Sequence, residues 1–312
     1  MIKRMMQKKV SEIYSLVASS NLEKLNNFKL LLGQSAILAS RSMASKFHNL
    51  WDAEVRVFSQ WGEDGILDYL CEILSISRPK VIEIGAGDFM ECNSRFLGEN
   101  RNAKITLIDN RADLVKRVNA QDLRWKTYLQ AEKTWVTTAN IGEIVNRSRE
   151  KMCGIDILSL DLDGNDYWIL DAIDLQGMSI IIVEYNALFG GRAHVTVPMQ
   201  EDFDRSSSHF SCKYYGASLP AFVDLLSKKG FEFVGTNRPM TNAFFVRASM
   251  THLFSWKLPL DPMNFVDCHV REARDRDGKL RFASKKEEID SISRMPVINL
   301  ITSEKVALGD VI

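Results

Sequence analysis

The sequence has few cysteines, and no two of them stand at the short spacing of a zinc or redox motif. They number five among 312 residues. The five histidines are equally dispersed, and no two are placed to reach one metal from one helix. We therefore expect no structural zinc, and we expect reduced thiols of the kind found in cytoplasmic proteins. The cysteines are Cys71, Cys92, Cys153, Cys212 and Cys268.

An excess of charge and a long apolar run are also missing. Forty basic and forty acidic side chains cancel, so nothing in the overall charge favours a nucleic-acid partner. No apolar stretch approaches the ~18 residues that span a bilayer, so no transmembrane segment is expected. The basic residues near the start are not followed by the apolar run of a secretion signal. The sequence predicts a soluble, cytoplasmic protein.

Short apolar runs alternate with helix-compatible stretches along the middle of the chain. Such runs, without polar alternation, are typical of strands covered by helices on both faces. After them a helix ending near Gly230 precedes two further runs around a turn-rich segment, which predicts an antiparallel hairpin. The pattern predicts an α/β fold, a doubly wound and mostly parallel sheet with an antiparallel C-terminal hairpin. The expected strands are Val81–Ile84, Ile105–Ile108, a weaker one near Thr127–Leu129, Ile157–Leu160, Ser179–Val183, Phe231–Gly235 and Ala243–Arg247.

The chain divides into three expected parts. Residues 1–50 form an N-terminal helical extension, residues 51–250 the α/β domain, and residues 251–312 a charge-dense C-terminal extension packed on that domain. The helical period from Val10 to Leu32 fits a helix on a membrane surface, but packing on the main domain or on a second subunit is favoured, which makes a homo-oligomer possible. The long polar stretch from Tyr185 to Ser218 predicts a substrate lid.

A glycine turn follows the first strong strand. Gly85 and Gly87 permit a tight turn and close approach of a ligand, and Glu83 places a carboxylate beside them. The dinucleotide fingerprint needs a third glycine where Met90 stands, which disfavours a pyrophosphate ligand. The second strand ends in Asp109, which can bind a ribose diol or cap the next helix. Ribose without pyrophosphate indicates S-adenosylmethionine.

Carboxylates are crowded at the ends of two later strands. Asp161, Asp163 and Asp166 follow the fourth expected strand, Ile157–Leu160, and Glu184 follows the fifth. Like charges this close raise one another's pKa values unless a cation lies between them. The cluster therefore predicts either a general base or a hard-metal site for Mg²⁺ or Ca²⁺, with Asp161, Asp163 and Glu184 as ligands.

The ordered set of these motifs resembles class I S-adenosylmethionine-dependent methyltransferases of the FkbM-type group. It covers roughly residues 58 to 247 and consists of Ser59-Gln60-x-Gly62-Glu63-Asp64-Gly65, Glu83-x-Gly85-x-Gly87, Asp161-Leu162-Asp163-Gly164 and Glu184-Tyr185-Asn186. The resemblance implies a Rossmann-like methyltransferase domain and O-methylation of a saccharide or small metabolite. It also implies that Glu83, Gly85, Gly87 and Asp109 hold the cofactor.

The remaining candidate site residues are two acidic residues before the first strand and the possible general bases. Glu63 and Asp64 either line the cofactor site or stabilise the positive end of a helix as its first acidic residues. The candidate bases are Asp161 and Glu184 at strand ends, with His194 and His209 in the long loop. Two other functions stay open. The chain is either a nucleotide-sugar or nicotinamide-dependent enzyme of the same fold, or a non-catalytic binding or scaffold protein.

Overall fold

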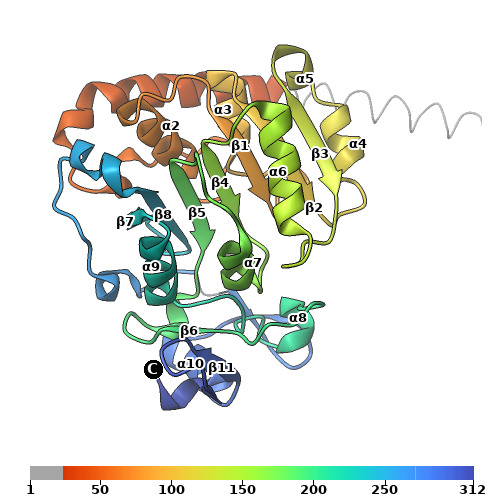
Figure 1. Cartoon of the computed structure of the whole chain (residues 1–312), viewed down its shortest axis with the longest axis vertical. Helices are drawn as coiled ribbons and strands as arrows, with labels where there is room; N and C mark the ends of the chain where they lie inside the picture. The colour runs from red at the N-terminus through yellow and green to blue at the C-terminus, as the bar shows by residue number, and fades with distance from the viewer. Residues whose placement is uncertain (1–23, 271) are drawn as a thin grey trace, which may run out of the picture.

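A seven-stranded sheet forms the centre of the computed structural model, which describes residues 24–270 and 272–312 (Figure 1). Its strands lie in the order β3-β2-β1-β4-β5-β8-β7. The first five in chain order pair in parallel, whereas β8 pairs antiparallel with both β5 and β7. The predicted fold class is confirmed. The strands are β1 (Lys80–Ile84), β2 (Lys104–Asp109), β3 (Leu129–Lys133), β4 (Ile157–Leu160), β5 (Ile180–Glu184), β7 (Phe231–Thr236) and β8 (Asn242–Arg247).

Helices cover both faces of this sheet, and each face has its own apolar cluster. Neighbouring residues of one strand belong to different clusters, because side chains alternate across a strand. Val81 packs with Leu67 and Leu97 on one face, and Ile82 packs with Ile144 on the other. This explains why the strands read as continuous apolar runs. The helices are α2 (Glu63–Ile73), α3 (Arg95–Arg101), α4 (Leu114–Asn119), α5 (Leu123–Lys126), α6 (Ile141–Met152), α7 (Asp166–Ala172) and α9 (Leu219–Lys228).

A smaller layer lies beyond the carboxyl ends of the parallel strands (Figure 1). Its three-stranded sheet joins the predicted lid to the C-terminal segment, because β6 pairs with β11 and β11 with β12. The C-terminal segment is therefore more than a solvated, charged face, since Ile292 and Val297 are fully buried there. The elements are β6 (Val195–Thr196), α8 (Arg205–Ser208), β9 (Glu272–Arg274), β10 (Leu280–Phe282), α10 (Lys285–Ile292), β11 (Pro296–Asn299) and β12 (Lys305–Ala307).

Residues 24–43 form a helix across the other end of the molecule (Figure 1). It supports the predicted N-terminal helix as far as Lys24, while the earlier part of that prediction lies outside the described residues. Within the described part of the chain, no helix is long and apolar enough to cross a membrane. Short 3-10 helices complete the fold, namely Ala44–Lys46, Leu50–Ala53, Ala187–Phe189, Ala248–Leu253, Pro262–Phe265 and Leu308–Asp310.

Candidate functional site

The glycine turn brings the ends of β1 and β4 into direct contact. Gly85 has a φ of 85°, and a Cβ built on it would lie 1.5 Å from the backbone oxygen of Asp161. Only glycine fits a left-handed conformation at so close an approach. Gly87 also has a positive φ, of 59°, but no atom lies within 4 Å of a Cβ built there. Gly85 is thus required by packing, whereas Gly87 leaves space beside the turn.

Asp109 lies across this turn at the end of β2. Its Oδ2 accepts a hydrogen bond of 2.8 Å from the Gly87 N–H, and its Oδ1 accepts one of 2.8 Å from the Arg111 N–H. The helix that follows begins only at Leu114, so Asp109 is not its capping residue. Each carboxylate oxygen can accept a second hydrogen bond. The side chain is therefore held in place with capacity to bind a diol.

Gly85, Gly87 and Asp109 line a cavity of about 480 Å³, here called the first cavity. Trp135 and Arg205 also line it, and Asp161 lies where it meets the end of β4. It opens beyond the carboxyl ends of the strands, where the order reverses between β1 and β4. Open α/β sheets bind their ligands at such a position. Its volume is within the range of small-molecule sites.

Glu83 is buried one step below the turn and is already engaged. Its two carboxylate oxygens accept hydrogen bonds from the backbone N–H groups of Asn93 and Ser94, at 2.8 and 2.9 Å. These groups stand at the start of α3, where an anionic ligand of a dinucleotide-binding fold would be held. Burial raises the Glu83 pKa despite these hydrogen bonds. Glu83 thus holds the two residues just before α3 and supports the turn from below.

A second cavity of about 260 Å³ adjoins the first and shares Asp161 and Arg205 with it. Glu184 at the end of β5 lines it on the sheet side. The C-terminal segment contributes Glu272, Arg274 and Glu288 to its wall. A third cavity, of about 140 Å³, lies between Glu83 and Asp161. Asp161 therefore borders all three cavities.

Three carboxylates meet where the cavities join. Oxygens of Asp161, Asp163 and Glu184 lie within 4.8 Å of one another, as the sequence predicted from the strand ends. Enclosure by the protein and the nearby negative charges raise the pKa values of Asp161 and Glu184 well above their ordinary range. Glu184 Oε2 is buried and has no hydrogen-bond partner among the described residues. An unsatisfied buried oxygen of this kind favours a donor or a cation supplied by a ligand.

Asp166, the third aspartate after β4, stabilises the loop itself. Asp166 is buried, and its carboxylate accepts hydrogen bonds from the N–H groups of Leu162 and Gly164, at 2.7 and 2.9 Å. Burial raises its pKa to about 6. These bonds close the turn after β4 and hold Asp163 in a left-handed conformation, with a φ of 56°. Asp166 therefore shapes the loop that carries the other two carboxylates.

Arg205 is a site residue that the sequence did not single out. It begins α8, in the predicted lid, and its guanidinium pairs with Asp163. Its Nε donates to the backbone oxygen of Cys212 at 2.6 Å, and its Cζ lies 3.8 Å from the centre of the Tyr215 ring. Forty-two residues separate Arg205 from Asp163 in the chain, so no local pattern could have indicated the contact.

Glu63 and Asp64 hold protein groups rather than line a cavity. Both are fully buried. Glu63 Oε1 accepts from the side-chain amide of Asn242 at 2.9 Å, and Asn242 lines the second and third cavities. Asp64 Oδ2 accepts the N–H groups of residues 57–59 at 2.7–2.8 Å, which holds the turn before Gln60. Gln60 itself lines the second and third cavities. These contacts favour positioning roles over direct cofactor contact.

The two loop histidines lie away from the carboxylates, and neither lines the three cavities. His194 Nδ1 lies 2.8 Å from the Asp224 carboxylate on α9. His209 Nδ1 lies 2.7 Å from the Ser211 hydroxyl, and burial together with the charge of Arg276 lowers the His209 pKa. A base must come within hydrogen-bond reach of its proton. Asp161 and Glu184 are the better-placed candidates, and the histidine roles stay predictions.

Comparison with known proteins gives only weak likenesses. No protein-family model matches the chain, and no curated protein matches it. Similar solved structures include the N-terminal domain of EvdMO1 with SAH bound (11% identity, 59% of this chain and 79% of that chain, TM-score 0.38). An O-methyltransferase family 2 protein from Planctomyces limnophilus in complex with apigenin (12%, 56% and 51%, TM-score 0.32) and the cyclase SpnF (13%, 66% and 73%, TM-score 0.33) are further examples. The matched proteins differ in activity, so the function of this chain must be argued from its own site.

Proposed function

We propose that this chain is an S-adenosylmethionine-dependent methyltransferase that methylates a hydroxyl group of a saccharide or another small metabolite. The observation that carries the proposal is the junction of the first and second cavities at Asp161 and Arg205. Transfer of a group between two bound molecules requires adjoining pockets whose reacting atoms meet at the boundary. Here that boundary is also where the carboxylates with raised pKa values lie.

The first cavity suits this cofactor in its charges and in its hydrogen-bonding groups. Asp109 is held where it can accept the ribose hydroxyls, and the missing third glycine at Met90 disfavours a pyrophosphate. S-adenosylmethionine has a ribose, no pyrophosphate, and positive charge on its sulfonium and amino groups. Asp161 and Asp163 line this cavity at the junction and would attract those charges. When bound, the cofactor supplies an activated methyl group.

The chain's own task is then to orient the acceptor hydroxyl and to take its proton. Asp161 and Glu184 compete for negative charge, so one of them retains a proton while the other ionises first. The ionised carboxylate would accept the hydroxyl proton as the acceptor oxygen gains the methyl group and the C–S bond of the cofactor breaks, with its electron pair kept by sulfur. The positive charge of Arg205 lowers both pKa values and so favours ionisation of the pair. Arg205 also borders both cavities, where it can order the two ligands.

The second cavity is suited to a hydroxylated acceptor. Its wall carries amide, carboxylate and cationic groups, including Asn242, Glu272 and Arg274. Trp61 adds an aromatic side chain that could cover a sugar ring, while the Tyr215 ring is stacked on the Arg205 guanidinium. Since the C-terminal segment forms part of this wall, we propose that it contributes to the choice of acceptor.

Calorimetry with Asp109→Ala tests the proposal. We expect unmodified protein to bind S-adenosylmethionine or its demethylated product, and the variant to bind about 10- to 100-fold more weakly, because it lacks the charged acceptor for the ribose. Asp122→Ala is the matched control, since Asp122 is exposed, makes no side-chain cap hydrogen bond and does not line the first cavity. No heat with either cofactor form would refute the proposal. Binding of a dinucleotide instead would favour a nicotinamide-dependent enzyme.

A scaffold protein could also bind the cofactor, so binding must be joined to turnover. Methylated product from any member of a library of saccharides and hydroxylated metabolites would exclude a non-catalytic role. A cofactor that binds tightly with no product from any acceptor would favour the scaffold.

Removal of divalent cations tests the metal interpretation of the cluster. We expect full activity after exhaustive chelation, because Asp163 already pairs with a cation, the Arg205 guanidinium. Loss of activity that Mg²⁺ or Ca²⁺ restores would instead assign Asp161, Asp163 and Glu184 as metal ligands.

We also propose that the activity is cytoplasmic. The five cysteines have free thiols, and Cys153 is exposed. Free thiols persist in a reducing compartment.

A further inference from the structure

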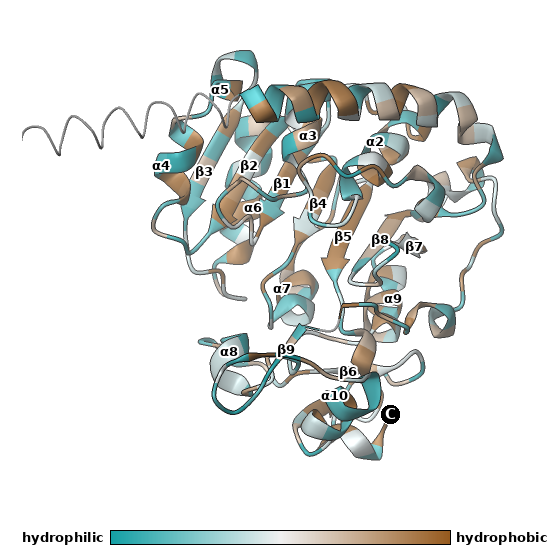
Figure 2. Cartoon of the chain, turned by 180° about the vertical axis from the view of Figure 1, so that it is seen from behind, coloured by the Kyte–Doolittle hydropathy of each residue, from teal (hydrophilic) through white to brown (hydrophobic). Residues whose placement is uncertain are grey.

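The helix at residues 24–43 turns its large apolar side chains outward. Leu25, Phe28, Leu31, Leu32 and Leu38 are between 50% and 67% exposed. They recur at the spacing of one helix face, so they form a continuous stripe rather than scattered contacts. Figure 2 shows apolar residues along this helix at the surface of the molecule. Contiguous exposed apolar surface marks an interaction site.

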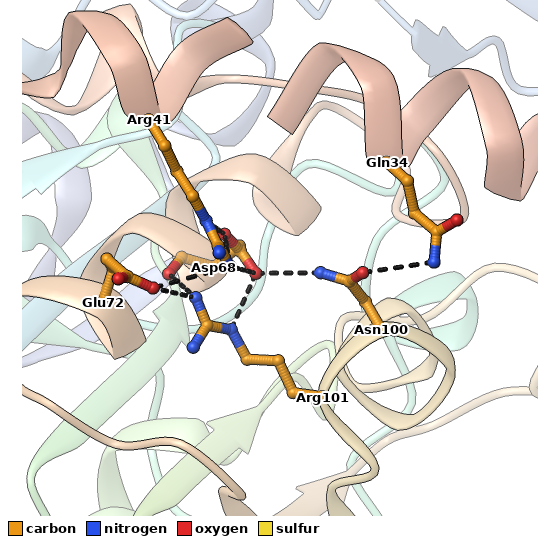
Figure 3. A network of polar contacts seen from close by, with 6 residues as sticks. All are labelled: Gln34, Arg41, Asp68, Glu72, Asn100 and Arg101. Carbon is orange, nitrogen blue, oxygen red and sulfur yellow. Dashed lines mark hydrogen bonds and ion pairs between the residues drawn. The ribbon is translucent and has the colours of Figure 1, made fainter. Parts of the chain in front are cut away.

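Polar contacts on the opposite side of the helix fix this orientation. Arg41 donates to both carboxylate oxygens of Asp68 on α2, at 2.9–3.1 Å, and Gln34 donates to Asn100 on α3 at 3.3 Å (Figure 3). Asp68 is 1% exposed and also binds Arg101. Such a network is specific in geometry, so the helix cannot rotate without breaking the contact of Arg41 with both oxygens of this buried carboxylate. The same inward side buries Ile37 against Val57 and Phe96, so the apolar stripe is left facing outward.

The charges along this segment have one sign. Residues 24–51 contain no aspartate and no glutamate. Lys24 and Lys29 are exposed within one turn of Leu25 and Phe28, and Lys46 is exposed just beyond the end of the helix. An apolar stripe with only basic flanking residues is typical of helices that lie in the interface of an anionic bilayer. A second copy would bring a face of the same sign, and like charges would oppose that pairing.

The position of the helix leaves the candidate site accessible. In both whole-chain views the helix lies at one end of the molecule, and the layer containing α8 and α10 lies at the other (Figures 1 and 2). Contact through the stripe would thus leave the cavities at the carboxyl ends of the strands uncovered.

We propose that the outward face of residues 24–43 docks this protein on an anionic lipid surface, with the leucine and phenylalanine side chains inserted among the headgroups and the lysines against lipid phosphates. Docking of this kind is peripheral and requires no spanning segment. It is independent of the function proposed above, because it depends only on this helix and the contacts that orient it.

Flotation of the full chain with lipid vesicles tests this proposal. We expect partition onto vesicles that contain phosphatidylglycerol, little onto pure phosphatidylcholine, and release at high salt. Leu31→Ser with Leu38→Ser should weaken partition at least about tenfold, because two large apolar side chains are lost from the interface. Lys24→Gln and Lys29→Gln should each weaken it about fivefold. Phe282→Ser with Ile301→Ser is the matched control and should have no effect, since these equally exposed side chains lie in the C-terminal segment.

Three results would overturn the proposal. One is absence of partition onto anionic vesicles, and another is equal partition by the leucine double variant. The third is a dimer in sedimentation velocity that Leu31→Ser with Leu38→Ser dissociates, which would assign the stripe to a second copy. Unchanged thermal unfolding of the variants is expected, because all the substituted side chains are at the surface.

Discussion

Replacing either member of the carboxyl pair, by Asp161→Asn or Glu184→Gln, is expected to lower kcat by about 10²- to 10⁴-fold. Each substitution keeps the size of the side chain but removes a group that can take the acceptor proton. Cofactor affinity should change less, since Asp109 and the glycine turn are untouched. Single-turnover measurement of methyl transfer with saturating cofactor separates the chemical step from binding.

Asp163→Asn provides the comparison within the same cluster. Its side chain is 56% exposed and pairs with Arg205, so its loss should cost much less than that of Asp161 or Glu184. Equal losses at all three positions would contradict the base assignment and favour a shared metal. Full activity of both Asp161→Asn and Glu184→Gln would contradict any role of the pair in proton transfer.

The pH dependence follows from the same pair. The pKa values of both carboxyls are raised, and the base must be ionised, so kcat/KM should rise with pH through the raised pKa of the pair. Arg205 lowers both pKa values. Arg205→Gln should therefore move the acidic limb of the profile to higher pH by about one unit. An unshifted limb in a folded Arg205→Gln protein would remove Arg205 from this role.

Gly85→Ala is expected to destabilise the protein by about 3–5 kcal/mol and to abolish cofactor binding. The added Cβ would lie 1.5 Å from the Asp161 backbone oxygen, at a φ of 85°. Either the end of β1 or the end of β4 must move, and Asp161 moves with the latter. Denaturant unfolding measures the loss of stability, and calorimetry measures the loss of binding.

Gly87→Ala two residues on is the matched control. It adds the same methyl group at a positive φ but meets no atom within 4 Å. It should cost only the conformational strain of about 1–2 kcal/mol, while any further effect should fall on the cofactor that approaches this turn. Equal destabilisation by the two substitutions would mean that the close contact at Gly85 is relieved without cost.

Much of the sheet could be predicted from the sequence, because a strand buried on both faces needs a continuous apolar run. β1, β2, β4, β5 and the C-terminal hairpin lie where the runs predicted them. β3 begins at Leu129, where the weaker prediction ended, since only its first residue is fully buried and the pattern is correspondingly faint. The meeting of Asp161 with Glu184 was equally predictable, because neighbouring parallel strands end at the same edge.

The remainder of the candidate site required the tertiary structure. Arg205 reaches Asp163 across forty-two residues, and the C-terminal segment closes the second cavity through a strand pairing that no local pattern indicates. The hydrogen-bond partners of Glu83 and Asp64 also became known only from the tertiary structure. The sequence predicted cofactor contact for both, and the structure adds that each carboxylate accepts hydrogen bonds from backbone N–H groups.

The strands, the helices and the glycine turn could therefore be predicted from the sequence. The burial of a strand and the backbone freedom of glycine depend on residues that are adjacent in the chain. The sequence by itself determined the doubly wound sheet and its carboxylate-rich edge. Only the tertiary structure decided which carboxylates face a cavity, which cation joins them, and which side of the helix at residues 24–43 is held inward. These three features depend on contacts between segments that are distant in the chain. The same residues could make many such contacts, and the packing of the whole fold selects among them.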